Sequence, residues 1–422
     1  MTNRAAIVLS FVVLTAAAAM LGGPGPRSAT DPPRERFATC LAQATGTPAS
    51  GLESLDSLMC RLLDSARVPG GAVAVSRQGR LVYARGFGYA DTIRKTRVGP
   101  TSLFRIASLS KPFTAVTALL LAQAGFLSLD EPAMGPLLQR LPPSVRVRDE
   151  RLQAVTFSHL LSHSAGWDRE AHNWDPMFAS DSIANALHVP APADLDAIIR
   201  YTLTDSLQFS PGSRFAYSNV GYAIAGRLLE LLARAPYDSV VARYVLMPAG
   251  IRRMQLGSTR PNERAPGEVL YYDTRRVPSV FPGEGEVGFP DGGFYLEPMG
   301  AHGGWLASVV DLMRFAVRVD GLPDPPDLLD AHYFASMLEP SIAGSGYGMG
   351  WYVAGHGVDR LWWHPGDIPG TKALMVCAAN GLAFAALFNG SSVRPDRLRD
   401  QIMEVIARID SWPTEDMFPH YP

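Results

Sequence analysis

The sequence contains very little lysine. Of its 38 lysines and arginines, only Lys95, Lys111 and Lys372 are lysines. Three cysteines and nine histidines are also few, and their scatter does not suggest a metal site. The net charge of −2 over 422 residues gives no reason to expect nucleic acid or an acidic membrane surface as a partner. With 47% hydrophobic residues, the chain is expected to form one large or two medium globular domains.

Long apolar runs are also scarce, and the longest lies at the N-terminus. Arg4 precedes an uncharged apolar stretch over residues 5–21, and Gly-Gly-Pro-Gly-Pro follows it. This order is typical of a secretory signal, so we expect residues 1–29 to be a signal peptide and the protein to be periplasmic or secreted. The run is at the lower limit for spanning a bilayer, so an uncleaved anchor is the alternative. Only in that case do we expect a membrane as a partner.

Export would place the cysteines in a compartment that permits disulfides. Cys40 and Cys60 lie close enough in sequence to pair near the mature N-terminus. Cys377 falls in an apolar strand pattern and is expected to be buried and free. Three cysteines cannot all pair within one chain.

The scarcity of lysine makes the position of Lys111 informative. Ser108 and Lys111 are three residues apart, which on a helix places them on one face. Pro112 is tolerated only near a helix start, so the pair should lie in the first turn of a helix that ends near Gly125. That helix is apolar on nearly all sides and should be buried. Burial favours the neutral amine, which beside a serine hydroxyl can act as a general base. The alternative is that Ser108 caps the helix and Lys111 is a solvated surface residue.

Strand patterns lie at both ends of the chain, with helical patterns between and around them. Two hairpins are predicted, turning at Gln78-Gly79 and Asn380-Gly381. Residues 347–353 predict a further strand, 52–66 and 394–409 predict amphipathic helices, and 261–293 predict a long surface loop that could close over a cleft.

This order predicts an α/β fold of the α+β kind. We expect an antiparallel sheet built from both chain ends and flanked by the terminal helices, with a mostly helical region inserted. The expected division is a signal peptide (1–29), a discontinuous sheet domain (37–105 and 300–412) and a mostly helical insert (106–299).

Two further stretches carry polar residues that can reach one cleft. Tyr217 and Asn219 directly precede a predicted helix, where a tyrosine can relay a proton and an asparagine can hold a lysine or a substrate carbonyl. Alternatively, they are a core aromatic and a helix cap. In His364-Pro-Gly366, a glycine after a strand lets a substrate approach the backbone, and the N–H of Asp367 could then serve an oxyanion hole. On its own, His364 is better read as a partly buried histidine at a strand edge.

In this order, the three motifs resemble those of the serine penicillin-recognising enzymes, which include penicillin-binding proteins, class C β-lactamases and related esterases. That family uses Ser-x-x-Lys, Tyr-x-Asn and Lys/His-x-Gly, and the resemblance extends over about residues 52–410. The matching motifs are Ser108/Lys111, Tyr217/Asn219 and His364/Gly366.

The resemblance implies a role for each residue. Ser108 would be the acylated nucleophile, and Lys111 and Tyr217 would share the proton transfers. Asn219 would position Lys111 and the substrate, and the backbone N–H groups of Ser108 and Asp367 would form the oxyanion hole. The family needs no metal and no cofactor.

Two histidines lie in a stretch that is similar to the family, within His159-Leu-Leu-Ser-His163-Ser-Ala-Gly. Neither matches a catalytic role, so we expect both to be structural.

The third motif departs from the β-lactamase pattern. A lysine there would offer a permanent cation to a substrate carboxylate, whereas His364 is largely neutral at pH 7. Asp367 adds negative charge beside it, and Lys372 enters the next strand and need not reach the cleft. We therefore predict an exported serine esterase or amidohydrolase that acts on a small ester, amide or peptide. The alternatives are a β-lactamase or D-alanyl-D-alanine carboxypeptidase, and a non-catalytic binding or sensor protein on the same scaffold.

Overall fold

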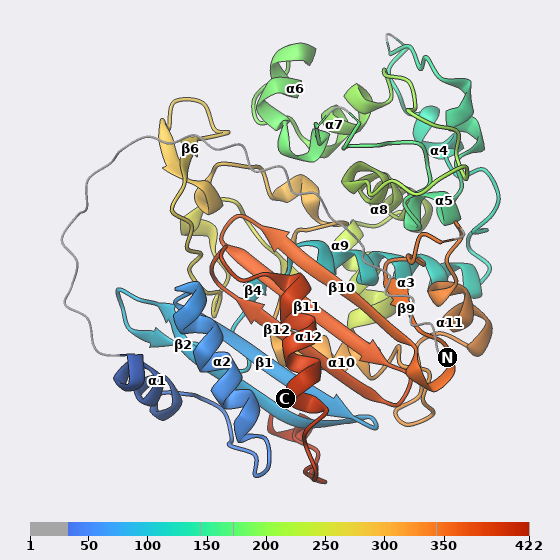
Figure 1. Ribbon diagram of the computed structural model, residues 1–422. Coiled ribbons are helices and arrows are strands. Elements are labelled where there is room, and N and C mark those ends of the chain that lie inside the picture. The colour runs from blue at the N-terminus through green and yellow to red at the C-terminus, as the bar shows by residue number, and fades with distance from the viewer. Residues whose placement is uncertain (1–32, 144, 172, 343, 422) are drawn as a thin grey trace, which may run out of the picture.

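The centre of the computed structural model is a seven-stranded sheet in the order β3-β2-β1-β12-β11-β10-β9, in which all neighbouring strands are antiparallel (Figure 1). The structure describes residues 33–143, 145–171, 173–342 and 344–421, so the expected signal peptide lies outside it. The strands are β1 (Gly70–Arg77), β2 (Arg80–Asp91), β3 (Thr96–Arg97), β9 (Tyr352–Ala354), β10 (Leu361–Ile368), β11 (Thr371–Ala378) and β12 (Leu382–Phe388).

The sheet joins the two ends of the chain at its middle, where β1 pairs with β12. Both predicted hairpins are present, β1–β2 and β11–β12. The prediction of one antiparallel sheet built from both chain ends is therefore confirmed.

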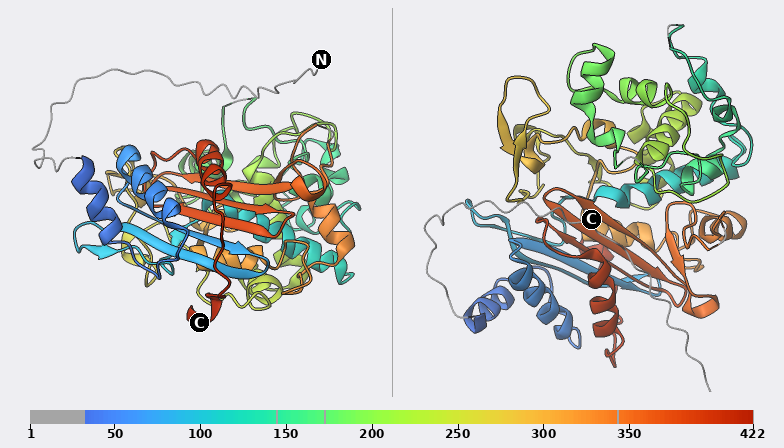
Figure 2. Two further views of the ribbon diagram at one scale, coloured as in Figure 1. Left: turned by 60° about the horizontal axis from the view of Figure 1, so that its bottom comes forward. Right: turned by 45° about the horizontal axis from the view of Figure 1, so that its top comes forward.

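Terminal helices cover one face of the sheet. α2 (Glu53–Ala66) and α12 (Pro395–Ile406) pack against β1 and β11 on the side that lies below the sheet in the right panel of Figure 2. Because alternate residues of a strand point to opposite faces, Val73 and Val75 enter the core under these helices, whereas Ala72 and Ala74 enter the core of the other face. α1 (Pro33–Ala42) packs beside α2.

Helices from the middle of the chain cover the other face and extend beyond it (Figure 1). They are α3 (Ser110–Gln123), α4 (Gly135–Leu138), α5 (Phe157–Leu161), α6 (Ser180–Leu187), α7 (Leu195–Thr202), α8 (Asn219–Ala233), α9 (Tyr237–Val241), α10 (Val309–Ala316) and α11 (Ala331–Leu338).

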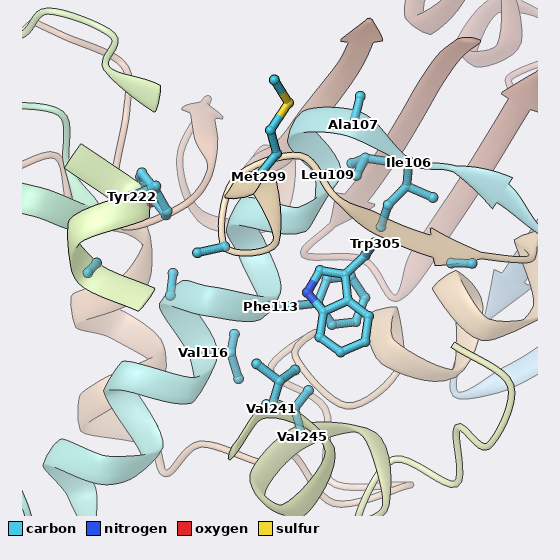
Figure 3. Close-up of a cluster of buried hydrophobic side chains, with 14 of the residues drawn as sticks. Ile106, Ala107, Leu109, Phe113, Val116, Tyr222, Val241, Val245, Met299 and Trp305 are labelled. Atoms are coloured by element: carbon cyan, nitrogen blue, oxygen red, sulfur yellow. The ribbon is translucent and has the colours of Figure 1, made fainter. Parts of the chain in front are cut away.

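α3 is buried along almost its whole length, as its composition predicts. Figure 3 shows Phe113 and Val116 of α3 beside Trp305, Val241 and Val245. The Phe113 ring also stacks on Phe315 of α10 at 4.0 Å between ring centres. These contacts hold α3 rigidly between the central sheet and the helices from the middle of the chain.

Short strands complete the structure and correct one expectation. β8 (Trp305–Ala307) pairs with β4 (Phe104–Arg105) and β5 (Gln255–Leu256). The segment 261–293 is not a plain loop, because it contains a hairpin of β6 (Arg276–Pro278) and β7 (Glu286–Gly288).

The strand predicted over 347–353 is largely absent. β9 begins only at Tyr352, since Gly350 has a φ of 87°, outside the β region, and the chain turns there.

Among the described helices, none has the length and apolar character needed to cross a membrane.

Candidate active site

Ser108 lies on a tight turn that leads into α3. Residues Ala107–Leu109 form a 3₁₀ turn, so the α-helix starts at Ser110, two residues later than the position of the predicted nucleophile. Ala107 has a φ of 49°, which is strained for a residue with a side chain. Between residues 103 and 119, only Ser108 is not buried. The turn therefore presents one hydroxyl from an otherwise closed core.

Neighbouring strands hold this turn in place. The N–H of Ile106 donates to the carbonyl of Trp305 at 2.9 Å, which continues the β4–β8 pairing. The hydroxyl of Ser110 donates to the carbonyl of Ala107 at 2.7 Å and accepts from the N–H of Trp305 at 3.3 Å. These bonds fix the backbone on both sides of Ser108.

Lys111 is fully buried and has three polar neighbours. Its Nζ lies 3.1 Å from Ser108 Oγ, 2.8 Å from Asn219 Oδ1 and 3.0 Å from the carbonyl oxygen of His302. Burial lowers the pKa of Lys111 well below its ordinary value, and the charge of Arg169 adds to that effect. The burial predicted for this lysine is present, and the neutral amine is favoured.

A neutral amine has two N–H donors and one lone pair. The amide oxygen of Asn219 and the carbonyl of His302 can only accept, so they take both donors. The lone pair then faces Ser108, whose hydroxyl donates to it. This arrangement is that of a general base poised on a serine hydroxyl.

Asp175 fixes the orientation of the Asn219 amide. Its Oδ2 accepts a hydrogen bond from Asn219 Nδ2 at 2.6 Å. Because a carboxylate only accepts, the NH₂ of Asn219 must face Asp175 and its oxygen must face Lys111. Asp175 lies in the loop before a 3₁₀ turn, Pro176–Phe178, and was not among the predicted residues. No motif in the sequence marks it.

Tyr217 lies against Lys111. The ring centre is 4.8 Å from Lys111 Nζ and 4.2 Å from the ring centre of His163. Burial raises the pKa of the Tyr217 phenol above its ordinary value, and hydrogen bonding with Ser108 opposes part of that rise. Tyr217 therefore stays a neutral phenol that can donate or relay a proton.

The two histidines that we expected to be structural have such contacts. His163 accepts the N–H of Ser218 on Nδ1 at 3.1 Å and supports the loop that carries Tyr217. His159 forms a capping box with Thr156 at the start of α5.

Gly366 brings β10 against the nucleophile turn. It lies inside β10 rather than after a strand. A Cβ on Gly366 would lie 2.2 Å from the carbonyl oxygen of Ile106, so only glycine allows this approach. We predicted that a substrate would approach the backbone at this glycine, but the carbonyl group of Ile106 occupies the space beside it.

Asp367 and Lys372 face each other across β10 and β11. They are register partners, and Lys372 Nζ donates to Asp367 Oδ1. The Asp367 side chain is 60% exposed, so this pair lies at the surface. We expected Asp367 to add negative charge beside His364, but the ammonium group of Lys372 offsets that charge.

His364 is buried. Its Nδ1 donates to the carbonyl of Pro365 at 2.7 Å, so Nε2 accepts from the hydroxyl of Tyr347 at 3.1 Å. Burial, and then the charge of Lys111, lowers the pKa of His364 to about 3. The ring is neutral, as expected, but it is less accessible than a residue at a strand edge.

The cysteines lie away from this site. Cys40 and Cys60 form a disulfide that ties α1 to α2, with 5.8 Å between their Cα atoms. Cys377 is buried in β11 as a free thiol. Within the described ranges, no group of three or more histidine, cysteine or acidic side chains could hold a metal.

Comparison with known proteins gives a consistent family. The sequence model described as Beta-lactamase matches residues 55–407. The esterase EstB of Burkholderia gladioli is 31% identical over 249 residues, a match that covers 58% of this chain and 60% of EstB. The chain therefore spans less than two thirds of the length of this relative.

Solved structures share the fold. The octameric penicillin-binding protein homologue from Pyrococcus abyssi superposes with a TM-score of 0.66 at 22% identity, covering 84% of this chain and 77% of its own. The D-amino acid amidase from Ochrobactrum anthropi SV3, in complex with D-phenylalanine, gives a TM-score of 0.63 at 23% identity, covering 84% and 99%.

Proposed function

The chain belongs to the Beta-lactamase family, and on that premise we propose that it is an exported serine esterase or amidohydrolase that forms an acyl-enzyme on Ser108. The observation that carries this proposal is the set of three contacts around Lys111 Nζ. Two of them use up the N–H donors of a neutral amine, which leaves its lone pair for the proton of Ser108.

Acylation then follows from the geometry. Ser108 Oγ gives its proton to Lys111 Nζ and attacks the carbonyl carbon of the substrate. We assign the stabilisation of the oxyanion to the backbone N–H groups of Ser108 and Asp367, and the close approach of Gly366 on β10 to Ile106 supports this assignment. The leaving group departs with the proton from Lys111, passed directly or through the hydroxyl of Tyr217.

Deacylation reverses the proton path. Water attacks the ester carbonyl of the acyl-enzyme and gives a proton to Lys111, by the same route. The carboxylic acid product leaves as Ser108 Oγ takes the proton back. Replacing Lys111 by alanine, or Tyr217 by phenylalanine, should each reduce the rate at least about a hundredfold.

An ester or amide substrate is favoured over a β-lactam because the third motif offers no permanent cation. His364 is neutral and buried, and Lys372 is held by Asp367. Similarity to an esterase and to a D-amino acid amidase agrees with this choice. The disulfide between Cys40 and Cys60 supports export, since disulfides persist in oxidising compartments.

The test is the intact mass of the protein after exposure to a fluorophosphonate or to a penicillin. We expect a fluorophosphonate adduct on the native protein and none on Ser108→Ala. An adduct that forms equally on Ser108→Ala would contradict the assignment of the nucleophile. A lasting penicillin adduct would favour a penicillin-binding protein, and no adduct with either probe on folded protein would favour a binding or sensor protein.

A further inference from the structure

The candidate cleft contains an arginine with unused hydrogen-bond donors. The guanidinium carbon of Arg169 lies 4.8 Å from the centre of the Tyr217 ring, which is the same distance as that of Lys111 Nζ from this ring. The guanidinium makes no hydrogen bond to any described residue. Its ion-pair partner Asp175 is 3.8 Å away, beyond hydrogen-bond distance. Five N–H donors that no described residue accepts from therefore lie beside the Tyr217 ring.

Asp175 is poorly placed to satisfy these donors. Its Oδ1 accepts from the N–H of Met177 at 3.0 Å, and its Oδ2 accepts from Asn219 at 2.6 Å. The Arg169 side chain is 39% exposed, whereas that of Asp175 is 14% exposed. The cation, not the carboxylate, is thus presented to whatever enters the cleft. The adjacent Glu170 is exposed and forms no ion pair with Arg169 within the described ranges.

The other basic groups near Ser108 cannot act as free cations. Lys111 is buried with a lowered pKa, and His364 is neutral. Lys372 donates to Asp367. In the described part of the chain, Arg169 is therefore a permanent positive charge that the candidate site can offer a ligand.

A small cavity adjoins this arginine. It measures about 60 Å³, and its lining includes Arg169 and Asn219 together with three carboxylates, Asp168, Asp175 and Asp205, of which Asp168 is paired with Arg214. This volume has room for several waters, and therefore for a carboxylate group. A guanidinium binds a carboxylate through two parallel N–H···O bonds, which gives both affinity and orientation.

We propose that Arg169 binds a carboxylate of the substrate, so that the preferred substrates are esters or amides with a carboxylate a few bonds from the scissile carbonyl. This inference rests on the proposed acyl transfer at Ser108. It places the residue that recognises the substrate carboxylate on the loop after α5, and not in the third motif on β10.

The test uses pairs of esters that differ only in whether the carboxylate is methylated. In the first pair, 4-nitrophenyl hydrogen glutarate and its methyl ester, the carboxylate lies on the acyl side. In the second pair, 4-butyryloxybenzoate and its methyl ester, the carboxylate lies on the leaving group. We expect the native protein to prefer the anionic member of one pair in kcat/KM. Arg169→Met should reduce that preference at least about tenfold, and Arg169→Lys should restore part of it.

The ratio within a pair separates recognition from general-base strength. Arg169 also lowers the pKa of Lys111, so its loss changes the rate with every substrate, but this effect cancels between two esters that use the same base. Arg243→Met is the matched control, because Arg243 also lies over a tyrosine ring, that of Tyr244 at 5.4 Å, on the segment Ala242–Leu246. It should keep the native preference. A preference that Arg169→Met leaves unchanged, or no preference in either pair, would overturn the proposal.

A binding measurement distinguishes this failure from failure of the proposed function. If neither methyl ester is hydrolysed in a Ser108-dependent way, the proposed function fails, and the carboxylate site is tested by calorimetry on Ser108→Ala. Monomethyl glutarate should bind this variant at least about tenfold more tightly than dimethyl glutarate, and adding Arg169→Met should remove the difference. Equal binding of the two esters to Ser108→Ala would refute the site.

Discussion

Replacing Gly366 by alanine tests how closely β10 must approach the nucleophile turn. The added Cβ would lie 2.2 Å from the carbonyl oxygen of Ile106 and 2.9 Å from the Cβ of Ala373. An unstrained carbon–oxygen contact is about 3.3 Å, so β10 and the turn must separate by about 1 Å. These two atoms belong to the backbone and to a short side chain, which cannot swing aside.

A shift of this size acts on both rate and stability. A misplacement of about 1 Å in an active site can cost about a hundredfold in rate, and we expect kcat/KM for 4-nitrophenyl butyrate to fall by about that factor. Crowding in a packed interior costs about 1–3 kcal/mol, so the free energy of unfolding, measured in urea by circular dichroism, should fall by that amount. The rate of fluorophosphonate labelling should fall together with kcat/KM.

The matched control is Gly135→Ala. Gly135 is the first residue of α4, and a Cβ there would meet nothing within 4 Å. This variant should keep the native rate and stability. If Gly366→Ala stayed folded with native kcat/KM and native labelling, the close approach of β10 would not matter for catalysis, and the oxyanion hole would have to be sought elsewhere.

Two further predictions concern pH and the disulfide. Because the base is neutral Lys111, kcat/KM should rise with pH as this lysine loses its proton, at a pH well below its ordinary pKa of 10.5. His364, with a pKa of about 3, should add no limb near neutrality, so a pH–rate profile that rises only near the ordinary lysine pKa would refute this assignment. Removing the disulfide with Cys40→Ser and Cys60→Ser, which are separated by 20 positions, should lower the free energy of unfolding by about 2–4 kcal/mol. A reductant should lower the melting temperature of the native protein but not that of the double variant, and equal effects on both would contradict this prediction.

Local patterns in the sequence determined much of the fold. The turn pairs Gln78-Gly79 and Asn380-Gly381 predict two hairpins, and both form. The apolar run after Lys111 predicts a buried helix, and α3 is buried. These predictions succeed because hairpin turns and helical faces depend on residues that are near each other in the chain. The same holds for the motif spacings that indicate a serine hydrolase.

Features that depend on the path of the backbone were not predicted correctly. Ser108 lies on a 3₁₀ turn before α3, and Gly366 lies within β10. The segment over 347–353 is mostly not a strand, and 261–293 contains a hairpin. In each case, the sequence identifies the residues but not the backbone conformation or the strand pairing that they adopt in the fold.

Contacts between distant segments were decided only by the tertiary structure. The carbonyl of His302 accepts from Lys111 across 191 positions, and a backbone carbonyl has no side-chain signature in a sequence. Asp175 orients Asn219 from 44 positions away, and Arg169 reaches the ring of Tyr217. The amino-acid sequence thus indicates which groups are available for chemistry. Folding decided which donors and acceptors meet, because a hydrogen bond requires atoms within about 3 Å in space, whatever their separation in the chain.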